Sequence, residues 1–248
     1  MIMKIGLTGS KGFIGQHLAK ALKENKKVEL LGCDLPKADL LRIASLAKFA
    51  AKQDVIIHAA AVNRGSNTAV IAGSVVVTYN LLSALKKSQS RAKIVYLSSI
   101  RAENDSPYGL SKRLTEVMLE NYSQEQKVPV VVLRLTNVFG EDCRPFYNSV
   151  VATFCHQVAH DKKLTVKNGQ RKVNFIYIED AVKAVLKEVF QPRKQLFYLK
   201  KTTSGNEITV GDLAKLIKSF PKIKNSGGLK QKFHKNLYKT YLSHNKNL

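Results

Sequence analysis

The stretch TGSKGFIGQHL, residues 8–18, decides the fold. An apolar run that predicts a strand over 2–8 precedes it, and apolar residues at helical spacing over 13–23 follow. Its three glycines are spaced G-x-x-G-x-x-G, which permits a tight turn and a close approach of a pyrophosphate to the helix N-terminus. The stretch therefore predicts a dinucleotide-binding junction built from Gly9, Gly12, Phe13, Ile14 and Gly15.

Two further segments fit the same cofactor. Asp34 closes the next predicted strand, 19 residues beyond Gly15, where a carboxylate can hold a ribose diol. The small residues Ala59, Ala60 and Ala61 follow the third predicted strand and leave room for a dinucleotide over the strand tip. His58, which ends that strand, has no carboxylate or nucleophile nearby in sequence, so we interpret it as a packed histidine.

The first two thirds of the chain alternate apolar runs with helical patterns, which indicates βαβ units and a parallel sheet. The runs are continuously apolar, so helices should cover both faces of the sheet. The predicted fold is α/β, a doubly wound parallel sheet of Rossmann type with a small C-terminal substrate lobe. The predicted strands are 2–8, 28–33, 55–58, 94–98 and 130–135, and the predicted helices are 13–23, 40–51, 69–87 and 108–122.

The later sequence is less regular. We expect helices at 147–160, 178–189 and 210–220, and short strands near 164, near 175 and at 196–199. Residues 1–140, with returning segments near 173–199, should form the dinucleotide-binding core. Residues 141–220 should form most of the substrate-binding lobe, and 221–248 reads as a lysine-rich linker or tail.

A candidate catalytic pair lies in DSPYGLSKRLTE, residues 105–116. The polar cluster with a proline predicts a helix start, which places Tyr108 and Lys112 one turn apart on the same face. An ammonium near a phenol favours the phenolate and lowers the phenol pKa. The preceding strand ends in Ser98 and Ser99, so a hydroxyl, a phenol and an ammonium should meet at the carboxyl edge of the sheet, as hydride transfer requires.

In this order, TGSKGFIG, HAAAVNR, YLSS, YGLSK and RLTNVFG resemble the extended class of the short-chain dehydrogenase/reductase superfamily. The resemblance implies a Ser-Tyr-Lys site on NAD or NADP. Ser99, with Ser98 in reserve, would polarise a carbonyl, Tyr108 would pass the proton, and Lys112 would lower the phenol pKa and hold the nicotinamide ribose.

A narrower resemblance covers nearly the whole chain. HAAAVNR, the run NVFGEDCRPFYNSVVATFCH over 137–156 and LYKTYLS over 237–243 are similar to capsular-polysaccharide nucleotide-sugar reductases. That family acts on UDP-linked 4-keto-6-deoxy-N-acetylhexoses on the route to UDP-N-acetyl-L-fucosamine, which implies reduction at C4 to a 6-deoxy-talose product. The implied substrate-binding residues are Asn63, Asn137 near the pyrophosphate, and Arg144, Tyr147 and Asn148 at the sugar end.

Three features depart from that family. Its members usually continue into a metal-binding cupin domain that performs a C3 epimerisation, so we expect that activity and a metal to be absent here. Asp34 would repel the 2′-phosphate of NADPH and favours NAD, although Lys11 and Lys37 could receive that phosphate. Ser74 stands where the superfamily usually has an asparagine, which would weaken a water-mediated proton relay.

Alternatives in two classes stay open. A nucleotide-sugar 4-epimerase or 4,6-dehydratase would use the same three residues, although a dehydratase usually has Asp-Glu where this chain has Ile100-Arg101. The chain could also be a non-catalytic, NAD(P)-binding partner protein of polysaccharide assembly.

Composition limits the partners and the location. The chain of 248 residues has a net charge of +23, but its basic residues are mainly lysines spread along the sequence. We therefore expect a solvated lysine-rich surface with at most weak association with anionic surfaces, and no nucleic-acid binding. No apolar run suggests a transmembrane segment, and three widely spaced cysteines suit a reducing cytoplasm. Relatives often dimerise through the helices predicted at 69–87 and 108–122, so we expect a homodimer.

Overall fold

The computed structural model describes residues 2–34, 38–203, 205–223 and 226–245, which form two compact units. The first comprises residues up to Leu135 together with Val182–Thr202, and the second comprises Thr136–Ala181 and residues from Thr203 on. The returning segment thus enters the first unit at Val182, later than the expected position near 173.

The first unit is a parallel sheet of six strands in the order β2-β1-β3-β4-β5-β8. The strands are β1 (Met3–Thr8), β2 (Val28–Cys33), β3 (Val55–His58), β4 (Lys93–Ser99), β5 (Val130–Leu135) and β8 (Phe197–Thr202). Because the chain runs outward in both directions from β1, the carboxyl end of β1 lies at the topological switch point where such sheets bind ligands. The predicted Rossmann-type fold is confirmed.

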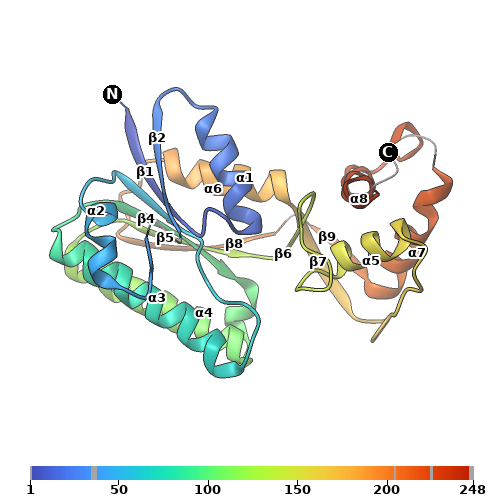
Figure 1. Ribbon diagram of the computed structural model, residues 1–248, viewed down its shortest axis with the longest axis horizontal. Coiled ribbons are helices and arrows are strands. Elements are labelled where there is room, and N and C mark those ends of the chain that lie inside the picture. Colours follow the sequence, from blue (N-terminus) through green and yellow to red (C-terminus); the bar gives the residue numbers. More distant parts are fainter. Residues whose placement is uncertain (1, 35–37, 204, 224–225, 246–248) are drawn as a thin grey trace. The chain divides into compact units, whose positions relative to one another are not determined.

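Helices cover both faces of this sheet (Figure 1). On one side are α1 (Phe13–Lys23) and α6 (Ile178–Phe190), and on the other are α2 (Ala47–Ala50), α3 (Asn67–Lys87) and α4 (Pro107–Gln126). Burial on both faces explains why the strands are continuously apolar: all four residues of β3 are buried, as are Ile94, Val95 and Val130.

Sequence-local signals set the starts of the two long helices. The Ser66 hydroxyl accepts a hydrogen bond from the Ala69 amide at the start of α3, and the Ser106 hydroxyl does the same for the Gly109 amide at the start of α4. Pro107 takes the first helical position, where its missing N–H is not needed. These signals place the first turn of α4 directly after the end of β4.

Helix α3 also has the length and apolar composition of a membrane span, and half of that apolar window is buried inside the protein. Among the described ranges it is the one helix that passes this test. Packing against the sheet and against α4 accounts for its apolar character.

The second unit contains a three-stranded sheet, in the order β6-β7-β9, and three α-helices. Its elements are β6 (Asn137–Phe139), α5 (Val150–Ala159), β7 (Lys172–Tyr177), β9 (Asn206–Thr209), α7 (Val210–Ser219) and α8 (Lys232–His244). Strands β6 and β7 are parallel, whereas β7 and β9 are antiparallel.

The expected linker or tail at 221–248 is corrected by α8. This helix buries Phe233, Leu237 and Tyr241, which recur every four residues along one face. The Phe233 ring packs edge-on against Phe139, with 5.7 Å between ring centroids. Frequent lysines on the opposite face concealed this apolar periodicity in the composition.

Three smaller expectations also differ from the structure. The helix predicted over 40–51 is limited to a 3-10 turn at Ile43–Leu46 and the short α2. No strand forms near Leu164 in the part of the chain that the structure describes, and β6 and β9 were not predicted. Strands of three or four residues carry too little pattern to be recognised from sequence alone.

Candidate active site

The glycine-rich loop between β1 and α1 brings backbone close to backbone. A Cβ atom on Gly15 would lie 2.0 Å from the Gly9 carbonyl oxygen, and Gly9 has φ = +71°, which favours glycine. Helix α1 follows directly, with Gly12 as its N-cap, no side-chain cap and no acidic residue in its first turn. Its first amide groups can therefore hold a phosphate, as the sequence predicts for Gly9, Gly12, Phe13, Ile14 and Gly15.

Asp34 lies beside this loop. Its Oδ2 accepts a hydrogen bond from the Ser10 amide at 2.9 Å and another from the Ser10 hydroxyl. The carboxylate is thus held at the end of β2, where a dinucleotide ribose would lie. Lys11 is exposed in the loop, whereas Lys37 lies outside the described residues.

The three alanines after β3 complete the backbone of this edge. A Cβ atom on Gly9 would lie 2.8 Å from the Ala60 nitrogen, so the loop and the end of β3 are in close contact. The Ala60 amide donates to the Thr8 hydroxyl at 3.2 Å. Ala59, Ala60 and Ala61 are all partly exposed, which leaves this edge open to a ligand. The glycine turn, the uncapped helix and the placed carboxylate together fit an NAD(P) dinucleotide.

His58 is a structural residue, as interpreted from the sequence. It is fully buried, and its two ring nitrogens hydrogen bond to the hydroxyls of Thr8 at 2.7 Å and Thr78 at 2.9 Å. Burial lowers its pKa to about 3, so the imidazole stays neutral near neutral pH.

The two serines at the end of β4 have different partners. The Ser98 hydroxyl is buried and donates to the Glu116 carboxylate at 2.5 Å. Ser99 is partly exposed, and its hydroxyl interacts with the phenol of Tyr108. The Ser99 hydroxyl is therefore the one that lies beside the phenol, and Ser99 stays the candidate for the catalytic serine.

Tyr108 and Lys112 lie one turn apart on α4. Lys112 is 3% exposed, and its ammonium donates to the Leu97 carbonyl at 3.0 Å and lies 5.8 Å from the centroid of the Tyr108 ring. Burial lowers the pKa of Lys112 to about 8, while the Glu116 carboxylate raises it. Because this pKa stays above 7, the ammonium remains charged at neutral pH.

The phenol differs from the sequence expectation. Burial raises the pKa of Tyr108, and the positive charge of Arg101 and the Ser99 hydroxyl only partly oppose this effect. The sequence predicts that the ammonium lowers the phenol pKa below its usual value. In this structure desolvation is the larger effect, so Tyr108 is a protonated phenol and can donate a proton.

Close packing fixes the start of α4 beside the site. A Cβ atom on Gly109 would lie 2.2 Å from the Arg101 carbonyl oxygen and 2.4 Å from Asn104 Oδ1. The 3-10 turn Ile100–Glu103 therefore presses on the helix turn that carries Tyr108. Ser74, the position of the usual asparagine, is buried in α3, and its hydroxyl has no hydrogen-bond partner among the described residues.

The substrate-binding residues expected from the resemblance fall in both units. Asn63 is exposed in the loop after β3 of the first unit, and the other four belong to the second. Asn137 begins β6, where its side-chain amide donates to the Asn174 carbonyl at 3.1 Å. The Arg144 guanidinium lies 5.5 Å from the centroid of the Tyr147 ring, so these two side chains are together.

A groove in the second unit contains two of these residues and two cations that were not singled out from sequence. Tyr147 and Asn148 line it together with Lys167 and Arg171. Lys167 and Arg171 lie in irregular backbone before β7, where no motif marks them. Among the residues that the structure describes, no group of three or more His, Cys, Asp or Glu side chains could hold a metal ion.

A dinucleotide-binding edge beside a serine, a tyrosine and a lysine defines an enzyme of the extended short-chain dehydrogenase/reductase class. The chain belongs to the NAD dependent epimerase/dehydratase family, whose model matches residues 5–195. Members of this family use NAD(P) to modify nucleotide sugars. NAD(P) is therefore the cofactor class of this chain, as the glycine-rich loop predicts.

One relative is the UDP-2-acetamido-2,6-beta-L-arabino-hexul-4-ose reductase of Pseudomonas aeruginosa. It is 33% identical over 245 residues, which is 97% of this chain and 64% of the relative. The Staphylococcus aureus capsular polysaccharide assembling protein CapF is similar in structure, with a TM-score of 0.80 and 28% identity over 98% of this chain and 65% of CapF. The chain thus spans just under two thirds of both relatives.

The structure of RMD from Pseudomonas aeruginosa, complexed with NADPH, matches with a TM-score of 0.85 at 20% identity. The match covers 98% of this chain and 99% of RMD. At this identity the similarity concerns the fold alone.

The glycine-rich loop gives a direct test of dinucleotide binding. We expect Gly15→Ala to weaken NADH binding at least tenfold, because the added methyl group would displace the Gly9 carbonyl and so the whole loop. Titration of NADH fluorescence measures the dissociation constant. Gly228→Ala is the matched control, since no atom lies within 4 Å of its added Cβ. Unchanged NADH affinity in Gly15→Ala would place the dinucleotide elsewhere.

Proposed function

We propose that this chain is an NAD(P)-dependent reductase of a UDP-linked 4-keto-6-deoxy-N-acetylhexose. The observation that carries the proposal is the meeting of Ser99, Tyr108 and Lys112 at the carboxyl end of β4. Strand β4 is two strands from β1, whose end carries the dinucleotide loop, and the ends of parallel strands share one edge of the sheet. The substrate is proposed from the 33% identical reductase.

Each of the three residues has a defined part in this reaction. When bound, the dinucleotide supplies the hydride that reduces the C4 ketone. The Ser99 hydroxyl donates a hydrogen bond to the ketone oxygen, and Tyr108 transfers its proton to that oxygen as the alcohol forms. The charged Lys112 then stabilises the phenolate that remains, so its ammonium acts on the transition state.

We prefer a reductase to a 4,6-dehydratase and to a 4-epimerase for two separate reasons. A dehydratase needs an acid and a base after the catalytic hydroxyl, and Ser99 is followed here by Ile100 and Arg101 in a 3-10 turn. A 4-epimerase retains its nicotinamide through the catalytic cycle, so release of the coenzyme on dilution separates it from a reductase.

Asp34 favours NADH over NADPH. Its carboxylate at the end of β2 accepts two hydrogen bonds from Ser10 and keeps a negative charge where NADPH would carry its 2′-phosphate. The Asp34 carboxylate and a 2′-phosphate beside it would repel each other, because both are negatively charged. We expect NADH to be oxidised faster than NADPH at equal subsaturating concentrations, and we expect Asp34→Asn to narrow the difference.

The first experiment is anaerobic mixing of the protein, NADH or NADPH and a UDP-4-keto-6-deoxy-N-acetylhexosamine, followed by the loss of nicotinamide absorbance. We expect oxidation by the wild type and a loss of at least about a hundredfold in kcat for Tyr108→Phe, which lacks the donated proton. Tyr79→Phe, an exposed tyrosine on α3, is the control.

Either result of this assay decides between classes of function. Oxidation that depends on Tyr108 supports the reductase. If neither coenzyme is oxidised although both bind, the non-catalytic partner protein becomes the better explanation.

The groove in the second unit is proposed to hold part of the UDP-sugar substrate. It combines the aromatic ring of Tyr147 and the amide of Asn148, proposed for the sugar end, with the cations of Lys167 and Arg171, which suit a pyrophosphate. Arg144, packed on the Tyr147 ring, and Asn137 belong to the same unit and the same proposal. Asn63, in the first unit, is proposed by itself as a substrate-binding residue.

Removal of one groove cation tests this assignment. We expect Arg171→Ala to raise KM for the UDP-sugar about tenfold with little change in kcat, because a bound phosphate loses one charged hydrogen bond in ground and transition states alike. Lys172→Ala is the control, since that side chain is 71% exposed and pairs with Glu207. An unchanged KM for Arg171→Ala would contradict the proposal that this groove binds the substrate.

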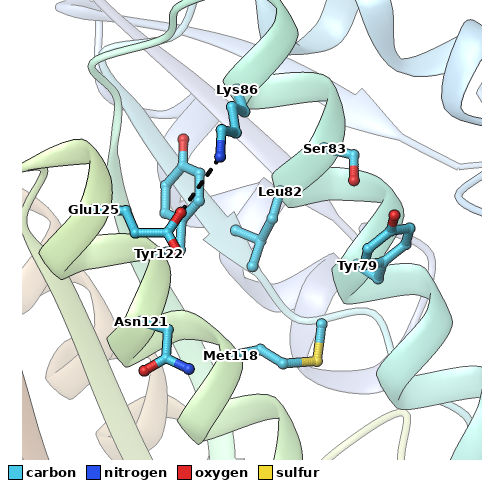
Figure 2. A pocket seen from close by; sticks show the side chains of 8 residues that line it. All are labelled: Tyr79, Leu82, Ser83, Lys86, Met118, Asn121, Tyr122 and Glu125. Carbon is cyan, nitrogen blue, oxygen red and sulfur yellow. Dashed lines mark hydrogen bonds and ion pairs between the residues drawn. The ribbon is translucent and has the colours of Figure 1, made fainter.

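The paired helices α3 and α4 are proposed as the contact surface of a homodimer. Their outer side exposes Val76, Tyr79, Leu114 and Val117, which are 40%, 57%, 50% and 49% exposed. Figure 2 shows the shallow groove between the two helices, with Tyr79 at its edge and the Lys86–Glu125 ion pair across it. The resemblance given in the sequence analysis implies a dimer through these two helices, so a second copy of the chain is the expected occupant.

The mass in solution tests this dimer. We expect the wild type to scatter as a dimer at micromolar concentration and Val117→Glu to scatter as a monomer, since the new carboxylate would be buried in the interface. Phe190→Glu, at an apolar position on α6 that is 41% exposed, should remain dimeric. A monomeric wild type would contradict the dimer.

The product class fits capsule or O-antigen polysaccharide synthesis in the cytoplasm. The three described cysteines are buried and free, as a reducing compartment requires. Deletion of the gene should remove the corresponding 6-deoxy amino sugar from the cell's polysaccharide, and a Tyr108→Phe copy should fail to restore it.

A further inference from the structure

A buried carboxylate lies behind the candidate active site. Glu116 is on α4, one turn after Lys112, and its side chain is 5% exposed. It accepts a hydrogen bond from the Ser98 hydroxyl at 2.5 Å and others from the Arg134 guanidinium of β5, with Nε at 2.9 Å from Oε1. Arg134 also forms an ion pair with Glu103, with Nη1 3.0 Å from Oε1. Lys201 of β8 forms a second ion pair with the same oxygen, with Nζ at 2.7 Å.

Stability alone does not account for this network. A buried ion pair gains little over well-packed apolar residues of similar size, because both charges must leave water. The partners of Glu116, however, are both next to the site. Ser98 directly precedes Ser99, and Arg134 pairs with Glu103, which is in the turn that contacts the start of α4. The network therefore connects β4, β5 and α4 at the point where the three catalytic candidates meet.

We propose that Glu116 is a positioning residue for the reductase reaction proposed above: through Ser98 it fixes the end of β4 that carries Ser99, and it supplies the negative charge that opposes the buried Lys112 ammonium. The inference rests on the proposed function.

The charges around Lys112 define the direction of the expected pH effect. The ammonium faces the Tyr96 ring of β4 at 4.8 Å, the Tyr108 ring at 5.8 Å and Glu116 on its own helix, and it lowers the pKa of His58 on β3. Arg134 forms ion pairs with both Glu116 and Glu103. Burial lowers the pKa of Lys112 to about 8 and Glu116 raises it, so loss of the carboxylate charge would lower this pKa further. The ammonium would then be lost at a lower pH than in the wild type.

The test is the pH profile of kcat for the wild type, Glu116→Gln and Glu120→Gln. We expect Glu116→Gln to lose activity at a lower pH on the alkaline side and to lower kcat about tenfold or more, with KM for the coenzyme unchanged within about twofold. Glu120→Gln removes an exposed carboxylate from the next turn of α4 and should match the wild type. Glu116→Asp, which keeps the charge, should restore the alkaline limit but not the full kcat.

Ser98→Ala tests the positioning role by itself, because it removes only the hydrogen bond between β4 and Glu116 and leaves the Glu116–Arg134 ion pair in place. We expect kcat to fall severalfold while the alkaline limit stays unchanged. It also serves as the second variant if Glu116→Gln does not fold. Wild-type kcat and an unchanged pH profile in both variants would overturn the proposal.

A readout that does not need catalysis separates this inference from the proposed function. In protein labelled with ¹⁵N at the lysine Nζ, the Lys112 resonance, assigned with Lys112→Met, should titrate at lower pH in Glu116→Gln than in the wild type. If the wild type has no reductase activity but this shift is present, the proposed function fails and the coupling of Glu116 to Lys112 stands. If the reductase is active and the shift is absent, the proposed charge role of Glu116 fails.

Discussion

The burial of the Lys112 ammonium is the constraint on which the candidate site depends. A charged group that leaves water must be compensated by hydrogen bonds and opposite charge, or it loses its proton. The Leu97 carbonyl, the Tyr96 ring and the Glu116 carboxylate provide that compensation. These groups belong to β4 and to the next turn of α4. A shift of the helix along the strand would therefore separate the buried ammonium from the groups that compensate its charge. The position of Tyr108, one turn earlier, follows from this anchoring.

A second constraint of a different kind acts at the other end of the site. The loop after β1 is shaped by the absence of side chains, since a single methyl group on Gly15 would collide with the Gly9 carbonyl. One end of the site is therefore fixed by charge and the other by steric contact between backbones. Both lie at the carboxyl edge of one parallel sheet, where the strand order reverses between β1 and β3 and sheets of this kind bind ligands.

The sequence predicted what depends on local pattern. Apolar runs identified the central strands of the first unit, because burial on both faces favours consecutive apolar residues there, as in β3 and β5. The helix α8 was missed, because its lysines dominate the composition while Phe233, Leu237 and Tyr241 form a narrow buried face. The Ser98–Glu116–Arg134 network was also missed, because its members come from β4, α4 and β5 and share no motif. Lys167 and Arg171 likewise lie in irregular backbone whose position only the fold determines.

The two adjacent serines show why residue type alone does not assign a role. Ser98 and Ser99 are chemically identical, and successive residues of a strand point to opposite faces. The Ser98 hydroxyl donates to the buried Glu116 carboxylate, whereas the hydroxyl of Ser99, the last residue of β4, interacts with the Tyr108 phenol. The same reasoning applies to Asp34: its charge matters for the coenzyme because Ser10 holds it at the end of β2. In both cases the function of a side chain follows from the partner that the fold supplies.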